Sequence, residues 1–116
     1  MFKLEYKAAV ACAHHLEDTK SLATKKCLRL HGHNYNVLAI IETSELKDGM
    51  VIDFGKLKEI IDVYDHQCLN DYLDNPTTES FAQLLHSDII NAMNDEREIK
   101  VEVIISESDK GSISYK

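Results

Sequence analysis

The sequence predicts an α+β fold in which an antiparallel sheet packs two helices against one face. Three observations support this class. Apolar and polar residues alternate near both ends of the chain, with the period of two that is typical of half-buried strands. Two central stretches instead repeat apolar residues at helical spacing. The length of 116 residues fits one domain, residues 1–116, with its elements in the order ββααββ.

Two long strands are predicted over residues 2–14 and 31–43. The first carries apolar residues on one parity and ends that face with His14, although a bulge would put His15 there instead. The second places His31 and His33 on the face that continues into its apolar residues. Residues 16–26 between the strands are mostly polar and are expected to form a loop.

The first helix is predicted to follow a turn at 47–49 and a short extended piece at 50–52. Asp53 is its expected N-cap, because an aspartate side chain accepts hydrogen bonds from the free N–H groups of a helix start. Apolar residues then recur at helical spacing until the helix ends near Asp65 and His66.

The second helix is predicted to begin at Thr77 and Thr78, either of which offers an N-cap hydroxyl. Period-two alternation returns over residues 99–107, and a last short strand is expected at 113–115. Continuing the alternation puts Glu107 on the apolar face, which is an unusual place for a carboxylate.

Composition excludes several classes of protein. The net charge of −7 argues against a nucleic-acid surface, although a local cluster of Lys25, Lys26 and Arg29 could bind an anionic substrate. No apolar run approaches the length of a membrane span, and the N-terminus does not resemble a secretory signal. Three cysteines form no disulfide framework, so we expect a reduced, cytoplasmic setting.

His31 and His33 are the strongest indication of a metal site. Residues i and i+2 of a strand share a face about 6–7 Å apart, so two imidazoles can reach one ion. Gly32 between them leaves room for a ligand, and His14 supplies a third nitrogen from the neighbouring strand. Three histidines with an open fourth position are typical of catalytic zinc. The alternative is a chance pair at a solvated strand end.

Cys27 has three possible roles. It could be a fourth ligand that closes a structural zinc site, or a free thiol activated by Lys25, Lys26 and Arg29, which favour the thiolate. It could also be an inert buried cysteine, although its charged neighbours argue against this.

Two further groups are candidates for chemistry. Asp65 beside His66 could orient the ring for acid–base catalysis, or His66 could simply favour the end of a helix through its dipole. Glu107 could accept a pair of N–H groups from the edge of a guanine or pterin, or could lie on a strand end frayed into solvent.

Several ordered motifs together resemble the 6-pyruvoyl-tetrahydropterin synthase family, and within it the bacterial 6-carboxy-5,6,7,8-tetrahydropterin synthases. The similarity covers nearly the whole chain. The motifs that carry it are Ala13-His14, Cys27-x3-His31-Gly32-His33-Asn34, Gly49-Met50-Val51-Ile52-Asp53-Phe54, Asp65-His66-Gln67-Cys68-Leu69-Asn70, Pro76-Thr77-Thr78-Glu79 and Glu107.

The resemblance implies the tunnelling fold, in which subunits join their sheets into a barrel with the helices outside, and a homohexamer of two stacked trimers. It implies zinc held by three matching histidines, a catalytic cysteine with an Asp–His proton relay, and a glutamate that anchors the pterin ring with the help of two threonines. These residues are, in this sequence, His14, His31, His33, Cys27, Asp65, His66, Glu107, Thr77 and Thr78.

The implied substrate is 7,8-dihydroneopterin triphosphate. The implied products are 6-carboxy-tetrahydropterin, acetaldehyde and triphosphate, on the route to queuosine and other 7-deazapurines. One alternative is triphosphate elimination to 6-pyruvoyl-tetrahydropterin, and another is a zinc-stabilised, non-catalytic pterin-binding module. Relatives that carry glutamate in place of the cysteine cleave dihydroneopterin-type substrates differently, and Cys27 argues against that branch.

Overall fold

Two long antiparallel strands, β1 and β2, form the centre of the sheet in the computed structural model, which describes residues 1–17 and 27–116. Their register places His14, at the end of β1, opposite His31, at the start of β2. The elements in chain order are β1 (Phe2–His14), β2 (His31–Thr43), α1 (Phe54–Asp62), β3 (Gln67–Cys68), the 3-10 turn η2 (Leu69–Asp71), α2 (Thr78–Ala92), β4 (Ile99–Ser106) and β5 (Ile113–Tyr115).

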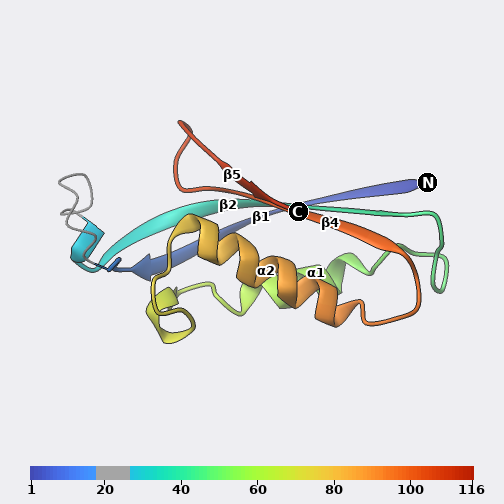
Figure 1. Ribbon diagram of the computed structural model, residues 1–116, viewed down its shortest axis with the longest axis horizontal. Helices are drawn as coiled ribbons and strands as arrows, with labels where there is room; N and C mark the ends of the chain where they lie inside the picture. The colour runs from blue at the N-terminus through green and yellow to red at the C-terminus, as the bar shows by residue number, and fades with distance from the viewer. Residues whose placement is uncertain (18–26) are drawn as a thin grey trace.

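The sheet has the order β3-β1-β2-β4-β5, and α1 and α2 lie together on one side of it (Figure 1). β1, β2, β4 and β5 pair antiparallel, which confirms the predicted α+β class and the ββααββ framework. β3 is an addition that pairs parallel with the end of β1. Its two residues are too few to show a period, so the sequence did not predict it.

The core lies between the helices and the face of the sheet that they cover. Side chains of one parity from the three long strands are buried there, as the alternation predicted. Tyr35 of β2 and Phe81 of α2 meet edge to face, with ring centroids 5.3 Å apart. Each large apolar side chain buried in this way contributes about 1.5–3 kcal/mol.

Both predicted N-caps are confirmed. The Asp53 carboxylate accepts a hydrogen bond from Gly55 N at 2.8 Å, and Thr77 Oγ1 accepts one from Ser80 N at 3.1 Å. α2 begins directly after Thr77, and its first turn lies beside the end of β1 (Figure 1). The Pro76 carbonyl, just before this turn, contacts His14 at the end of β1.

α1 ends three residues earlier than predicted, at Asp62. The following residues form turns that bring His66 into the left-handed region, with φ of 61°. The extended piece predicted at 50–52 is wrong, since this part of the chain forms only one isolated bridge, between Lys47 and Met50. A tight turn through Asp48 and Gly49 makes that bridge, and the chain then bends toward α1.

β4 also ends one residue earlier than predicted, at Ser106, so Glu107 lies just beyond the strand. Most of the loop expected at 16–26, including Lys25 and Lys26, lies outside the described residues.

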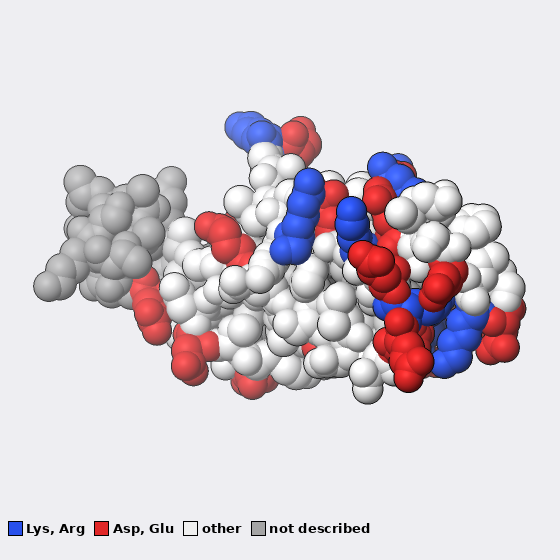
Figure 2. Space-filling model, turned by 45° about the vertical axis from the view of Figure 1, so that its right-hand side comes forward, with Lys and Arg blue, Asp and Glu red and all other residues white. Residues whose placement is uncertain are grey.

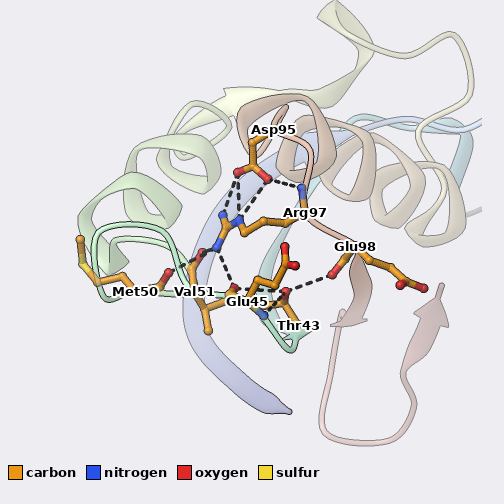
Figure 3. A network of polar contacts seen from close by, with 7 residues as sticks. All are labelled: Thr43, Glu45, Met50, Val51, Asp95, Arg97 and Glu98. Atoms are coloured by element: carbon orange, nitrogen blue, oxygen red, sulfur yellow. Dashed lines mark hydrogen bonds and ion pairs between the residues drawn. The ribbon is translucent and has the colours of Figure 1, made fainter.

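Arg97, in the segment between α2 and β4, forms hydrogen bonds to the turn that follows β2 (Figure 3). Its guanidinium pairs with the Asp95 carboxylate at 2.9 Å. It also donates to the carbonyl oxygens of Glu45, Met50 and Val51, at 3.3, 3.3 and 3.0 Å. This network holds the end of the sheet that lies opposite the histidine-bearing strand ends.

On the face seen in Figure 2, acidic and basic side chains are intermingled and do not gather into a basic surface. None of the described helices has the length and apolar character needed to cross a membrane.

Candidate functional site

Three histidines meet where β1 ends and β2 begins. The antiparallel register sets His14 opposite His31, and His33 follows two residues later on the same face. Each ring offers one nitrogen to a common point, with all three nitrogens within 4.8 Å of one another. Ring centroids lie 4.5, 4.9 and 4.8 Å apart, so the predicted convergence of three imidazoles is present.

Two backbone carbonyls fix which nitrogen the rings present. His14 Nδ1 lies 2.7 Å from the carbonyl oxygen of Pro76, and His31 Nδ1 lies 2.7 Å from that of Arg29. Since a carbonyl oxygen only accepts, each contact is a hydrogen bond in the ring form that carries its proton on Nδ1 and leaves Nε2 free for an ion. The two Nε2 atoms are 2.9 Å apart and point into the same small space. This donor set fits a divalent cation, and neutral imidazole is a preferred ligand of zinc.

His14 is the buried member of the cluster, with 1% of its surface exposed. Burial lowers the pKa of its ring, against the opposing effect of the Pro76 carbonyl, so the ring is neutral at neutral pH, as a metal ligand must be. The hydroxyl of Tyr35, itself fully buried, lies 3.2 Å from His14 Nδ1. Burial and the nearby charge of Glu107 raise the pKa of Tyr35, which keeps this hydroxyl protonated.

Glu107 lies at the edge of the cluster, although it is beyond the end of β4. Thr78 Oγ1 donates a hydrogen bond to Glu107 Oε1, and Glu107 Oε2 lies 3.7 Å from His33 Nε2. The carboxylate therefore lies close to the histidines, although it follows the strand end and its side chain is 38% exposed. Thr77 is placed beside Thr78, but its hydroxyl is already engaged as the cap of α2.

Asp65 and His66 form a pair, as predicted. Asp65 Oδ2 lies 3.0 Å from His66 Nδ1, and Asp65 Oδ1 accepts from Ala11 N at 2.9 Å. The Ala11 N–H is the main reason that the pKa of Asp65 is lowered, with the His66 ring adding to it. The His66 side chain is 82% exposed.

The Asp65–His66 pair lies beside the end of β1. His66 lines a shallow hollow with Ala11, Ala13 and Asn34, whose side chains alternate with those that face the core. His33 of the cluster also lines this hollow. Within one chain, no hydrogen bond or ion pair joins the Asp65–His66 pair to the cluster among the described residues.

Cys27 is half-buried and free, and its carbonyl oxygen accepts from Leu16 N at 2.7 Å. Among the described residues, the group that could hold a metal contains the three histidines and not Cys27. Cys12, in contrast, is buried in the core, and burial raises the pKa of its thiol to about 12. Lys25 and Lys26, the proposed activators of Cys27, lie outside the described residues.

Sequence reasoning missed three supporting groups: Tyr35 and the carbonyls of Pro76 and Arg29. Backbone acceptors leave no signal in residue types. Tyr35 did carry one, because it follows His31 and His33 on the same parity of β2.

Residues 3–116 match the family model described as 6-pyruvoyl tetrahydropterin synthase. The chain belongs to the 6-pyruvoyl tetrahydropterin synthase family. Among solved structures, the 6-pyruvoyl tetrahydropterin synthase of Caenorhabditis elegans superimposes with a TM-score of 0.74 and 26% identity, over 99% of this chain and 94% of that one. The fold seen here is thus the fold of this family.

Two relatives within the 6-pyruvoyl tetrahydropterin synthase family differ in the reactions for which they are named. The 6-carboxy-5,6,7,8-tetrahydropterin synthase of Bacillus subtilis is 31% identical over 128 aligned positions, covering 99% of this chain and 85% of that protein. The dihydroneopterin monophosphate aldolase of Pyrococcus furiosus is 36% identical over 84 residues, covering 69% of this chain and 68% of that protein. Both names concern pterin compounds, so they support a pterin-directed enzyme.

Proposed function

We propose that this protein is a zinc-dependent lyase that converts 7,8-dihydroneopterin triphosphate into 6-carboxy-5,6,7,8-tetrahydropterin, acetaldehyde and triphosphate, on the route to queuosine and other 7-deazapurines. Membership of the family supports a pterin-directed lyase, and the full-length similarity to the Bacillus subtilis enzyme supports the carboxy-forming reaction. The observation that carries the proposal is the Glu107 carboxylate beside the three histidines, because it would accept the N–H groups of a pterin ring next to the proposed metal site.

A zinc ion held by His14, His31 and His33 would act as a Lewis acid toward an oxygen of the substrate side chain and make the adjacent C–H protons easier to remove. Cys27, as thiolate, would take or return one such proton. His66 would serve the opposite proton transfer, with Asp65 orienting its ring and stabilising the charge that it gains.

Glu107 would accept hydrogen bonds from adjacent N–H groups of the pterin ring. Its carboxylate is already oriented by the Thr78 hydroxyl, which reduces the freedom lost when substrate binds. Thr77, the N-cap residue directly before α2, would support this edge by holding the first turn of α2 and Thr78 in place. Fixing the ring here would hold the substrate side chain over the metal.

A homo-oligomer, proposed as a hexamer of two trimers, would complete the site. Within one chain, no hydrogen bond or ion pair joins the Asp65–His66 pair to the histidine cluster among the described residues. A second subunit that brings its own pair to this cluster would place the proton relay beside Cys27. The reduced thiols and the triphosphate substrate fit a cytoplasmic setting.

Product analysis tests the reaction. Metal-replete protein is incubated with 7,8-dihydroneopterin triphosphate, and acetaldehyde, triphosphate and the pterin are quantified. Release of acetaldehyde with a 6-carboxy pterin is expected. A pyruvoyl pterin without acetaldehyde would instead support the elimination reaction, and cleavage of a dihydroneopterin monophosphate alone would favour the aldolase named for the Pyrococcus furiosus relative.

Replacing the thiol separates an enzyme from a zinc-stabilised binding module. Cys27→Ala is expected to retain zinc and to lose about 100-fold or more of turnover, because a proton-transferring group is removed. Cys68→Ala, which alters another half-buried thiol, is the matched control and should keep both. Loss of zinc from Cys27→Ala would support the module in which the sulfur is a fourth ligand.

A further inference from the structure

The segment that carries Cys27 is tied to the histidine cluster through one hydrogen bond. His31 Nδ1 donates to the carbonyl oxygen of Arg29, two residues after Cys27, at 2.7 Å. On the other side, Leu16 N donates to the carbonyl oxygen of Cys27, also at 2.7 Å. The thiol-bearing residue is therefore held between the end of β1 and the ring of a candidate metal ligand.

Cys27 and Leu28 are half-buried, whereas Leu30 is 64% exposed and the Arg29 side chain is also exposed. Two backbone contacts, one from Leu16 and one from His31, restrain the carbonyl groups of Cys27 and Arg29. Weakening either contact is expected to free the thiol, because exposed segments open locally at low cost.

The ring of His31 can hold the Arg29 carbonyl in only one of its neutral forms. A neutral imidazole has one proton, on Nδ1 or on Nε2. With an ion on Nε2 the proton stays on Nδ1 and donates to the carbonyl oxygen. Without an ion the other tautomer becomes accessible, and a bare Nδ1 then faces an oxygen that also only accepts. Ion binding thus selects the ring form that restrains the segment.

We propose that His31 is a positioning residue for Cys27, and that occupation of the three-histidine cluster by a divalent cation fixes the segment through Arg29. The inference rests on the metal site of the proposed function but needs no substrate. The two effects are thermodynamically linked. The factor by which the bound ion favours the restrained conformation of the segment equals the factor by which that conformation raises the affinity for the ion. Outer hydrogen-bond partners of metal-bound histidines typically change affinity about 10–100-fold.

The test is the alkylation rate of each cysteine, read peptide by peptide with iodoacetamide on the full chain. Chelator-treated and Zn²⁺-saturated protein are compared at alkaline pH, in the range where the rate no longer changes with pH. There the thiol is fully ionised, so an effect of the ion on ionisation alone leaves the rate unchanged. The Cys27 rate is expected to fall about fivefold or more with Zn²⁺, because its opening is suppressed, while the Cys68 rate stays constant.

Two variants separate the link from the ion itself. In metal-free protein, His31→Ala should speed alkylation of Cys27, since the hydrogen bond to Arg29 is gone, whereas His86→Ala, outside the cluster, should leave the metal-free rate unchanged. Equal alkylation rates of Cys27 in the two metal-free variants would overturn the proposal. An alkylation rate of Cys27 in the wild-type chain that is unchanged or faster with Zn²⁺ at alkaline pH would also overturn it. The wild-type comparison requires no variant to fold.

Cobalt substitution excludes the trivial cause of a slower rate. A thiolate-to-cobalt absorption band would show that Cys27 ligates the ion directly and would overturn the proposal. Its absence, together with the slower rate, supports positioning through His31. A chain that passes these tests yet fails to act on the pterin triphosphate would refute the proposed function and leave this inference standing.

Discussion

His14 and His31 face each other across the β1–β2 pair with their Nε2 atoms 2.9 Å apart. When each ring carries its proton on Nδ1, next to the carbonyl oxygen of Pro76 or Arg29, both Nε2 atoms point into one small space. A cation bound there would be held by both nitrogens. The end of the β1–β2 hairpin should therefore be more stable with an ion than without one.

Zinc is expected to raise the melting temperature of the wild-type chain. At an ion concentration about 100 times the dissociation constant, binding to the folded state alone adds about 2.7 kcal/mol. His14→Ala should abolish the gain, because it removes the most buried ligand. His15→Ala changes an exposed neighbour and should keep it. Thermal unfolding with zinc and with a chelator checks this, and an equal gain in both variants would contradict a site built on His14.

Glu107→Gln is expected to weaken pterin binding while zinc content is unchanged. The substitution removes a charged acceptor, and hydrogen bonds to charged groups contribute about 1.5–3 kcal/mol, or roughly 10–100-fold in affinity. Binding of a reduced pterin is measured by titration calorimetry on zinc-loaded protein. Glu59→Gln, on the exposed side of α1, is the matched control. Unchanged affinity in Glu107→Gln would remove the anchoring role of this carboxylate.

Period-two alternation predicted the bounds of β1 and β2 because both strands are long and have one buried face. The same alternation put His14, His31 and His33 on one face, so the histidine cluster followed from parity alone. Glu107 also fell near the cluster, although its strand ends before it. A one-residue error does not move a long, flexible side chain out of reach of its partner Thr78.

The position of His66 could not be predicted in this way. Its side depends on β3, a two-residue strand, and on a turn in which His66 itself has a positive φ. Neither has a period, and a positive φ at histidine has no reliable sequence signal. The carbonyls of Pro76 and Arg29 were equally invisible, since every residue has one. What escaped prediction was mainly backbone geometry, together with the buried hydroxyl of Tyr35 beside His14.

Acid should destabilise the wild-type chain more steeply than Asp65→Asn. Hydrogen bonds from Ala11 N and the His66 ring lower the pKa of Asp65 in the folded chain below its ordinary value of 3.8. As the pH falls past 3.8, the unfolded chain binds this proton first, so the stabilisation present above 3.8 is lost as the pH falls through the folded pKa. The asparagine variant has no such carboxyl.

Urea unfolding of both proteins across the acid range, without metal, gives the two curves of unfolding free energy against pH. The gap between wild type and Asp65→Asn should narrow toward low pH. Asp71→Asn, in η2, serves as the comparison for general charge effects. Parallel curves for wild type and Asp65→Asn would show that the Ala11 hydrogen bond does not hold this carboxylate in solution.

Arg97→Met should destabilise the fold without altering the metal site. Methionine keeps the apolar stem but removes the ion pair with Asp95 and three hydrogen bonds to carbonyl oxygens, in a side chain that is only 11% exposed. Leaving those partners unsatisfied is expected to cost about 2–4 kcal/mol. Lys56→Met breaks an exposed pair with Glu59 and should change stability by less than about 1 kcal/mol.

The network of Arg97 lies at the opposite end of the sheet from the histidines (Figures 1 and 3). A substitution in this network should therefore change the unfolding free energy without changing the affinity for zinc. Urea unfolding measures the first and zinc titration below the unfolding transition measures the second. Arg97→Met should lower only the unfolding free energy, whereas His14→Ala should lower zinc affinity in the folded chain. A large loss of zinc affinity in Arg97→Met would mean that the two ends of the β1–β2 pair are coupled, and that the histidine cluster depends on the whole sheet.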